Sequence, residues 1–209
     1  GDRHFTYWRD SSAARLMAED GAALDRALEG ADLVYFSGIT LAILNPRARG
    51  RLVKAIIRAR DKGARVAFDP NLRPALWSSQ RVMKSMLTVG AGIADIVLPT
   101  HSDEAPVFGD ADPDATATRY LDLGVAEVVV KNGASPAVIA TRDERHTIAA
   151  PMPAALVDTT GAGDSFNGAF LTARLAGQGL ADSAAAAHRI AGVVIGHRGA
   201  LVDPALLPR

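Results

Sequence analysis

The chain has 209 residues, which is enough for one substantial α/β domain. Its 23 basic and 23 acidic side chains balance, so no net positive charge draws the chain toward nucleic acid or an anionic membrane surface. The sequence has no cysteine, which excludes disulfides, thiolate zinc sites and cysteine nucleophiles, and no apolar run long enough to span a bilayer. We therefore expect a cytoplasmic protein with neither nucleic-acid nor membrane partners.

Short apolar segments alternate with longer amphipathic ones, a pattern that predicts a mostly parallel sheet with crossover helices. The predicted strands are residues 32–38, 65–69, 94–99 and 127–131, followed by a hairpin of 137–140 and 147–150. The predicted helices are residues 46–62, 78–89, 102–108, 114–123, 163–176 and 182–196. Because no repeat, low-complexity tract or linker interrupts this pattern, residues 1–209 are predicted to form a single domain.

The segment from Asp158 to Phe170 carries the clearest chemical signal, because it leads from extended chain through glycines into a helix. Gly161 and Gly163 lack a Cβ, so the backbone there can turn sharply and approach a ligand closely. The first amides of a helix have no internal acceptor, and with the helix dipole they form a site for phosphate oxygens. Asp164 either caps this helix or takes a proton from a hydroxyl that attacks a bound phosphate.

Other glycine motifs fit this segment less well. A dinucleotide-binding fingerprint needs its third glycine three residues after the second, whereas Gly168 comes later and another helix follows. A P-loop needs Gly-Lys-Ser or Gly-Lys-Thr, and neither occurs in the sequence.

The run Asp-Thr-Thr-Gly-Ala-Gly-Asp-Ser-Phe at 158–166 resembles the C-terminal signature of the ribokinase-like (PfkB) carbohydrate kinases. The resemblance implies a three-layer αβα sandwich of the ribokinase type, with ATP and Mg²⁺ as cofactors. It further implies that Gly161, Ala162 and Gly163 supply the amides of an anion hole and that Asp164 is the catalytic base.

The segment Leu98–Ala105 resembles the Asn-x-x-Glu region that organises magnesium and phosphate in this family. Thr100 stands where Asn is usual and is expected near ATP, while Asp103 or Glu104 replaces the family's Glu and is expected to reach the metal through water. The alternative is that Ser102 caps a helix whose first turn holds both acids, and we favour this alternative over direct metal contact.

The segment Val130–Ala137 resembles the family's loop along the nucleotide phosphates, with Pro136 in place of the second glycine. This resemblance implies that Lys131 and Gly133 bind ATP, the lysine by neutralising phosphate charge. A solvated lysine at the end of a strand is an equal alternative for Lys131.

Two further segments resemble those of the 2-keto-3-deoxygluconate kinases within this family: Tyr7–Ala14, and Phe68–Trp77 with its Asp-Pro-Asn-Leu-Arg run. Such a substrate carries a carboxylate, and planar guanidinium groups bind carboxylates through two hydrogen bonds. We therefore predict that Arg9 and Arg73 bind the acid end with Tyr7 beside them, and we include His197 as a further substrate-binding candidate. The alternative for Arg73 is a helix cap or a surface ion pair.

The resemblance extends along nearly all of the chain but covers only the last two-thirds of a complete family member. We therefore expect an N-terminal third to be missing from this chain, and residues near 1–15 to be a remnant of the lid or substrate segment. The predicted partners are a small sugar acid and ATP. A homo-oligomer is possible, and the sequence does not decide the oligomeric state.

The predicted reaction is ATP-dependent phosphorylation of 2-dehydro-3-deoxy-D-gluconate at its terminal 6-hydroxyl. The alternatives are another PfkB sugar kinase, such as a fructokinase or ribokinase, and a non-catalytic sensor or inactive fragment. The residue pattern leaves open whether the substrate is derived from gluconate or galactonate.

Overall fold

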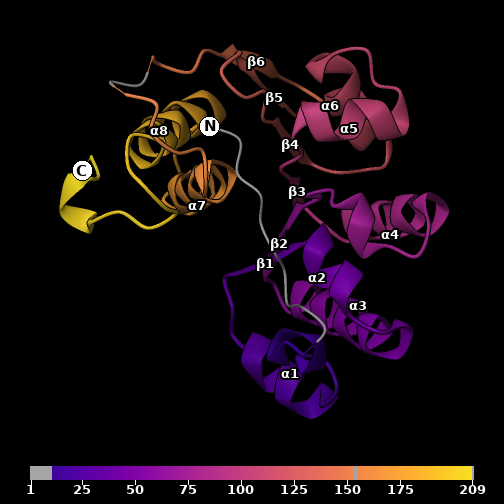
Figure 1. Cartoon of the computed structure of the whole chain (residues 1–209). Helices are drawn as coiled ribbons and strands as arrows, with labels where there is room; N and C mark the ends of the chain where they lie inside the picture. Colours follow the sequence, from indigo (N-terminus) through magenta and orange to yellow (C-terminus); the bar gives the residue numbers. More distant parts are fainter. Residues whose placement is uncertain (1–10, 153–154, 209) are drawn as a thin grey trace.

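A computed structural model describes residues 11–152 and 155–208 of the chain (Figure 1). Its six-stranded sheet has the order β1-β2-β3-β4-β5-β6, parallel from β1 to β4 and antiparallel through β5 and β6. The strands are β1 Leu33–Ser37, β2 Arg65–Asp69, β3 Ile96–Val97, β4 Glu127–Val130, β5 Ala137–Ala140 and β6 Arg145–Ile148.

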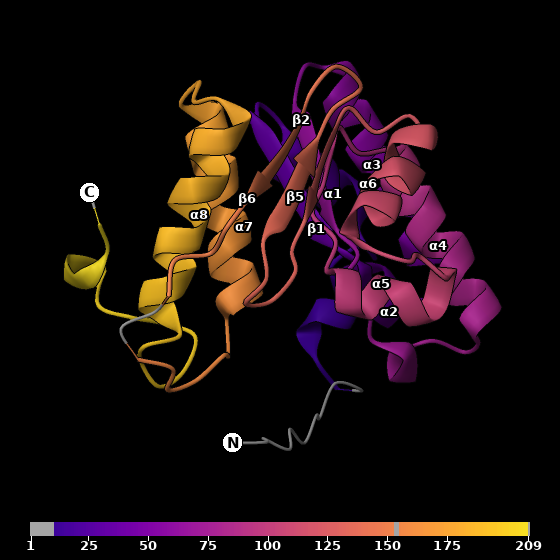
Figure 2. The same ribbon diagram turned by 90° about the horizontal axis from the view of Figure 1, so that it is seen from above.

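Helices cover both faces of this sheet. The α-helices are α1 Gly21–Leu28, α2 Gly38–Ile43, α3 Pro46–Asp61, α4 Gln80–Gly92, α5 His101–Phe108, α6 Pro113–Asp122, α7 Ala162–Leu175 and α8 Leu180–Val194. Short 3-10 helices are η1 Ala13–Leu16, η2 Pro74–Leu76 and η3 Pro204–Leu206. Helices α7 and α8 pack together on one side of the sheet and the other α-helices lie on the opposite side (Figure 2). This arrangement confirms the predicted three-layer α/β architecture.

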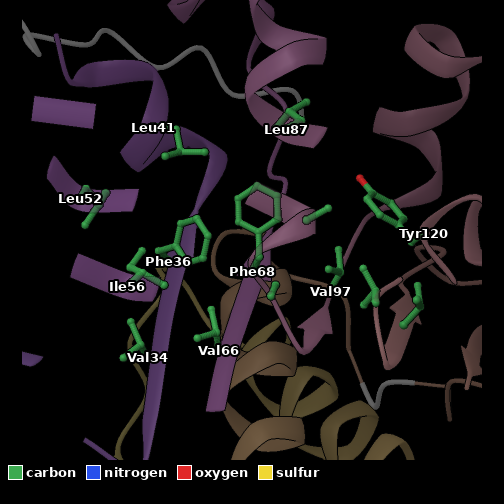
Figure 3. Packing of buried hydrophobic residues seen from close by; sticks show 14 of the residues in the cluster. Val34, Phe36, Leu41, Leu52, Ile56, Val66, Phe68, Leu87, Val97 and Tyr120 are labelled. Atoms are coloured by element: carbon green, nitrogen blue, oxygen red, sulfur yellow. The ribbon is translucent and has the colours of Figure 1, made fainter. Parts of the chain in front are cut away.

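The larger apolar core lies between the sheet and helices α1 to α6. The rings of Phe36 on β1 and Phe68 on β2 pack with centroids 4.7 Å apart, near Ile56 of α3 and Leu87 of α4 (Figure 3). A second core beneath α7 and α8 includes Val129, whereas its neighbours on β4 belong to the first core. Strand β4 is therefore buried on both faces, as its unbroken apolar run predicts.

Two helices were not predicted, and several element boundaries are shifted by a few residues. Helix α1 was not predicted, although Asp20 caps it by accepting from the amides of Ala22 and Ala23. Helix α2 was not predicted either: it begins at Gly38, the last residue of the predicted strand 32–38, because Ser37 and Thr40 form a capping box.

Strand β6 starts two residues before the predicted 147–150. The amide of Thr141 donates to the carbonyl of Glu144 at 2.8 Å, so the turn closes early and Arg145 pairs directly with Ala140. The connection between the two hairpin strands is therefore residues 141–144 rather than the predicted 141–146.

An ion-pair cluster fixes the C-terminal end of α7 to the sheet. Glu127 at the start of β4 accepts from Arg174 at 2.9 and 3.0 Å and from Arg65 at 2.7 Å. Burial raises the pKa of Glu127, but the hydrogen bonds and charges of Arg174 and Arg65 outweigh it and hold this pKa below its ordinary value. The N-terminal end of α7 therefore lies near the carboxyl ends of the parallel strands.

Throughout the two described ranges, every helix is too short or too polar to cross a bilayer.

Gly38 tests how tightly α2 packs against the loop after β2. A Cβ at this buried position would lie 2.0 Å from the carbonyl oxygen of Pro70, a backbone atom. We expect Gly38→Ala to lower the free energy of unfolding in urea by about 1–3 kcal/mol or more through overpacking. Gly50→Ala is the matched control, because that exposed helical glycine has no atom within 4 Å of the added Cβ and should gain roughly 0.5–1 kcal/mol. Equal stability of the two variants would contradict the close approach of α2 to Pro70.

Candidate active site

The candidate site lies where the parallel strands end. Asp69 is the last residue of β2, and Thr100 and Lys131 follow β3 and β4, where they form an isolated parallel bridge. The amide of Lys131 donates to the carbonyl of Pro99 at 2.8 Å, and the amide of His101 donates to the carbonyl of Lys131 at 2.9 Å. Ligands of open α/β sheets bind at this carboxyl edge.

Helix α7 begins at the same edge with a turn that needs glycine. Gly161 precedes the helix with φ 80°, and a Cβ there would lie 2.8 Å from the Cβ of Ala200. The amide of Ala162 donates to the carbonyl of Thr159 at 3.2 Å, whereas within the described residues the amides of Gly161, Gly163 and Asp164 have no protein acceptor. Of the amides predicted to bind an anion, those of Gly161 and Gly163 are therefore available together with that of Asp164, whereas that of Ala162 bonds within the chain.

Asp158 holds the loop before α7 against the loop after α8. Its Oδ1 accepts from the amide and hydroxyl of Thr160 at 3.0 and 2.7 Å, and its Oδ2 accepts from the amide of Gly199 at 2.6 Å. The motif's first acid is thus a buried structural residue that shapes the glycine turn.

His197 follows α8, and its Nδ1 donates to the carbonyl of Val193 at 2.9 Å. In the described part of the chain, no hydrogen bond or ion pair joins His197 to Asp164 or Arg73.

Asp164 is exposed in the first turn of α7, and Tyr35 of β1 contacts the same helix through Asn167. Burial and the charge of Asp69 raise the pKa of Tyr35 well above its ordinary range, and the charge of Asp164 contributes in the same direction. Asn167, three residues after Asp164 on α7, donates to both Tyr35 and Asp69, so these side chains lie around one region where the parallel strands end.

A buried polar cluster links β2, β4 and α7. Oδ2 of Asp69 accepts from Nζ of Lys131 at 3.0 Å and from Nδ2 of Asn167 at 2.6 Å. The same Nδ2 also donates to the hydroxyl of Tyr35 at 3.2 Å. Nζ of Lys131 lies 3.7 Å from the position of an added Cβ on Gly163, so its charge sits directly beneath the first turn of α7. Lys131 is 8% exposed, which contradicts its reading as a solvated strand-end lysine.

Arg73 and Asp103 meet next to this cluster. Nη1 of Arg73 lies 3.6 Å from Oδ2 of Asp103 and donates to the carbonyl of Leu72 at 2.7 Å. Burial raises the pKa of Asp103, with Arg73 and Lys131 opposing this shift and Asp69 adding to it. The structure thus brings four charged residues together where the parallel strands end: Asp69, Arg73, Asp103 and Lys131.

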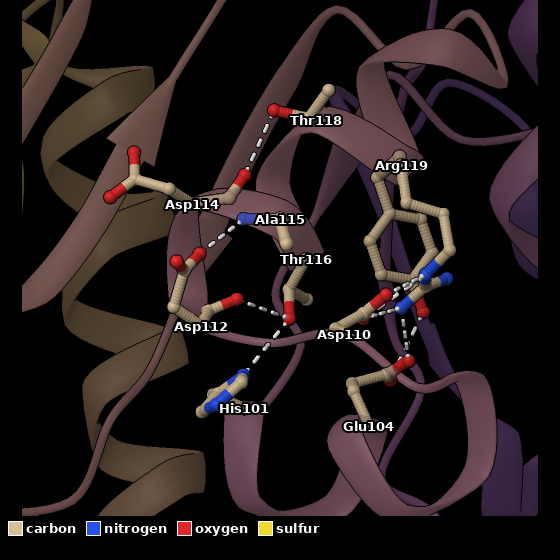
Figure 4. A network of polar contacts seen from close by, with 10 residues as sticks. His101, Glu104, Asp110, Asp112, Asp114, Ala115, Thr116, Thr118 and Arg119 are labelled. Carbon is tan, nitrogen blue, oxygen red and sulfur yellow. Dashed lines mark hydrogen bonds and ion pairs between the residues drawn. The ribbon is translucent and has the colours of Figure 1, made fainter.

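Glu104 lies elsewhere, in a buried network between α5 and α6 (Figure 4). Its Oε2 accepts from Nη2 of Arg119 at 2.7 Å and its Oε1 accepts from the hydroxyl of Tyr120 at 3.0 Å, while Arg119 also pairs with Asp110. Burial raises the pKa of Glu104 to about 7 despite Arg119. With both oxygens engaged and no exposed surface, Glu104 does not fit the predicted role near a metal, and we assign it to the packing of α5.

The family is decided by comparison with known proteins. Residues 1–205 match the profile of the pfkB family carbohydrate kinases. The chain belongs to this family.

The most similar relatives of this pfkB chain include 2-dehydro-3-deoxygluconokinases. Those of Dickeya dadantii and Escherichia coli K12 are 37% and 36% identical to it over 213 aligned residues, covering 100% of this chain and 69% of each relative. The crystal structure of aminoimidazole riboside kinase from Salmonella enterica, complexed with aminoimidazole riboside and an ATP analogue, has 28% identity and a TM-score of 0.72. That match covers 80% of this chain and 57% of the solved one, so the pfkB chain spans only part of the proteins it matches.

The residues of this pfkB chain fit a nucleotide better than an enclosed metal. Among residues 11–152 and 155–208, no three acidic or histidine side chains gather around a common point that would hold a cation. Asp103 is half-buried and has one arginine partner, so it suits a Mg²⁺ ion that keeps its waters and binds phosphate oxygens. Gly133, at φ 60° with open space around it, leaves the turn after Lys131 accessible to phosphates.

Sequence reasoning gave no site role to three side chains of this cluster: Asp69, which was noted only within the Asp-Pro-Asn-Leu-Arg run, Asn167 and Tyr35. Asn167 was not singled out, although its position three residues after Asp164 places both on one helix face. Tyr35 was also missed, because a tyrosine within a strand is an ordinary packing residue. Tyr7 and Arg9 lie outside the described residues, so their roles stay predictions.

Proposed function

We propose that the protein containing this chain transfers the γ-phosphoryl group of ATP to the 6-hydroxyl of 2-dehydro-3-deoxy-D-gluconate. The observation that carries the proposal is the exposed carboxylate of Asp164 on a helix turn whose amides at 161, 163 and 164 have no protein acceptor in the described structure. The relatives named for this reaction, which align with the whole chain, support the choice of substrate.

In this proposal Asp164 orients the 6-hydroxyl and accepts its proton as the oxygen bonds to phosphorus. The bond between that phosphorus and the β-γ bridging oxygen breaks, ADP leaves, and Asp164 later releases the proton to solvent. The unpaired amides of α7 stabilise negative charge on the moving phosphoryl group, and Lys131 adds a positive charge beneath Gly163. ATP would supply the phosphoryl group, and a bound Mg²⁺ would neutralise phosphate charge; Asp103 is the carboxylate proposed to hold it through water.

The acid end of the substrate is assigned to Arg73. Its side chain is 47% exposed at the carboxyl edge, and its contact with Asp103 is 3.6 Å long, so the guanidinium has donors available for a second carboxylate. A guanidinium can hold a carboxylate through two parallel hydrogen bonds, which a neutral sugar cannot accept in the same way. Arg9 and Tyr7 are proposed to complete this end of the pocket.

Asp164→Asn tests the base. The amide side chain retains the shape but cannot accept the proton, so we expect kcat to fall about 10²- to 10⁴-fold while the Kd of ATP stays nearly unchanged. Asp182→Asn is the matched control, because Asp182 is also an exposed acid in the first turn of a helix, α8. Near-normal turnover by Asp164→Asn would remove Asp164 from the base role.

Arg73→Gln tests the recognition of a sugar acid. Loss of a charge-assisted contact should raise the KM for 2-dehydro-3-deoxy-D-gluconate about 10- to 100-fold and leave the KM for ATP close to that of the parent protein. Arg81→Gln, at an exposed arginine in α4, serves as control. If the parent protein prefers neutral sugars such as fructose or ribose, the substrate assignment is wrong even where the kinase assignment holds.

A further inference from the structure

We propose that Asp69 is a positioning residue for phosphoryl transfer, acting through Lys131 and Asn167 on the first turn of α7. The inference rests on the proposed function, because it assigns this buried carboxylate to the same reaction. Neither residue 69 nor residue 167 needs to touch a substrate in this role.

The contacts of Asp69 connect three parts of the site. Its Oδ2 accepts from Lys131 at 3.0 Å and Asn167 at 2.6 Å, and its Oδ1 accepts from the amide of Asn71 at 2.9 Å. Asn71 has φ 34°, a left-handed conformation unusual for a side-chain-bearing residue, and it lies two residues before Arg73. One carboxylate therefore fixes a strand-end lysine, a helix and the loop that carries the candidate substrate arginine.

The burial of this cluster argues for more than a stabilising role. Asp69 is 3%, Lys131 8% and Asn167 1% exposed. Removing an ion pair from water is costly, and apolar residues of similar volume often replace a buried pair without loss of stability. The Oδ1 atom of Asn167 is moreover buried without a partner among the described residues, which adds a further cost. Stability alone thus does not account for the arrangement.

The geometry explains what the cluster positions. Asn167 lies three residues after Asp164 on the same helix, so its bond to Asp69 limits rotation and sliding of the turn that carries the base. Arg174 anchors the other end of α7 through Glu127. The ammonium group of Lys131 has three donors, and Asp69 is its acceptor in the described structure, which keeps it under Gly163.

This role predicts an unusual split between turnover and binding. Asp69→Asn retains the volume but removes a negative charge close to the proposed phosphate site, so the affinity for a polyanion should stay the same or rise. Lys131 and α7 lose their common anchor, so phosphoryl transfer should slow. Misplacement by about 1 Å can cost about 100-fold in rate, and we expect kcat to fall roughly 10- to 100-fold. A purely structural lesion would instead weaken nucleotide binding and turnover together.

The experiment measures kcat, both KM values and the Kd of a non-hydrolysable ATP analogue for Asp69→Asn in the full chain, well below its melting temperature. Asn167→Leu is the second variant: it keeps the Asp69–Lys131 pair, removes the tether to α7, and should lower kcat with little change in either KM. Thr172→Ala is the control, because that exposed α7 hydroxyl bonds only to the carbonyl of Gly168 in the described structure.

Lower kcat with unchanged or tighter analogue binding in Asp69→Asn supports the inference, as does lower kcat at constant KM in Asn167→Leu. Parent-like kcat in both folded variants overturns it, and so does analogue affinity that falls in step with turnover. A parent protein that phosphorylates no sugar acid contradicts the proposed function instead. In that case the Kd of the ATP analogue tests the inference. A higher Kd for Asp69→Asn than for the parent protein overturns it, and an equal or lower Kd supports the predicted effect of removing the charge of Asp69.

Discussion

The candidate site depends on a buried ion pair between Asp69 and Lys131, which joins the ends of β2 and β4 across the end of β3. Parallel strands bring their carboxyl ends to one edge, but they do not by themselves decide which side chains meet there. A carboxylate and an ammonium group two strands apart can both be buried because each neutralises the other and Asn167 adds a hydrogen bond. The pair holds the ammonium group of Lys131 close beneath the first turn of the helix that follows the glycine turn.

The first turn of that helix exerts two opposing electrostatic effects on a bound anion. The unpaired amides of Gly163 and Asp164 and the helix dipole attract an anion, whereas the carboxylate of Asp164 repels it. The positive charge of Lys131 favours the anion and offsets part of that repulsion. A hydroxyl that binds between Asp164 and a phosphate would meet a proton acceptor and a stabilised phosphorus at once, which is the requirement of phosphoryl transfer.

Much of the fold follows from local sequence patterns. The strands at residues 65–69 and 127–130 and the helix at 46–61 appear close to where apolar periodicity predicts them, and the family signature led to α7 and Asp164. Helix α2 was missed because Gly38 was assigned to the end of the predicted strand 32–38. In the structure Ser37 and Thr40 cap a helix there, and the close approach to Pro70 requires glycine at its first position.

The site was less predictable, since its charges meet only through tertiary structure. Asp103 and Glu104 are adjacent in sequence, yet their side chains point to different environments: one to the sheet edge with Arg73, the other to Arg119 in the core. Helical geometry separates adjacent residues by about 100° around the axis, and only the packing of α5 on α6 decides which of the two is buried. Asn167 likewise becomes significant only once Asp69 is known to lie beside it.

The most direct measurement is amide hydrogen exchange of the ¹⁵N-labelled full chain by NMR, with and without ADP, Mg²⁺, aluminium fluoride and the sugar acid. This mixture mimics a phosphoryl group in transfer. The account predicts that the amides of Gly161, Gly163 and Asp164 become protected while that of Ala162, already bonded to Thr159, changes little. Unchanged exchange at all three amides, with the nucleotide demonstrably bound, would contradict the assignment of the α7 turn as the phosphoryl site.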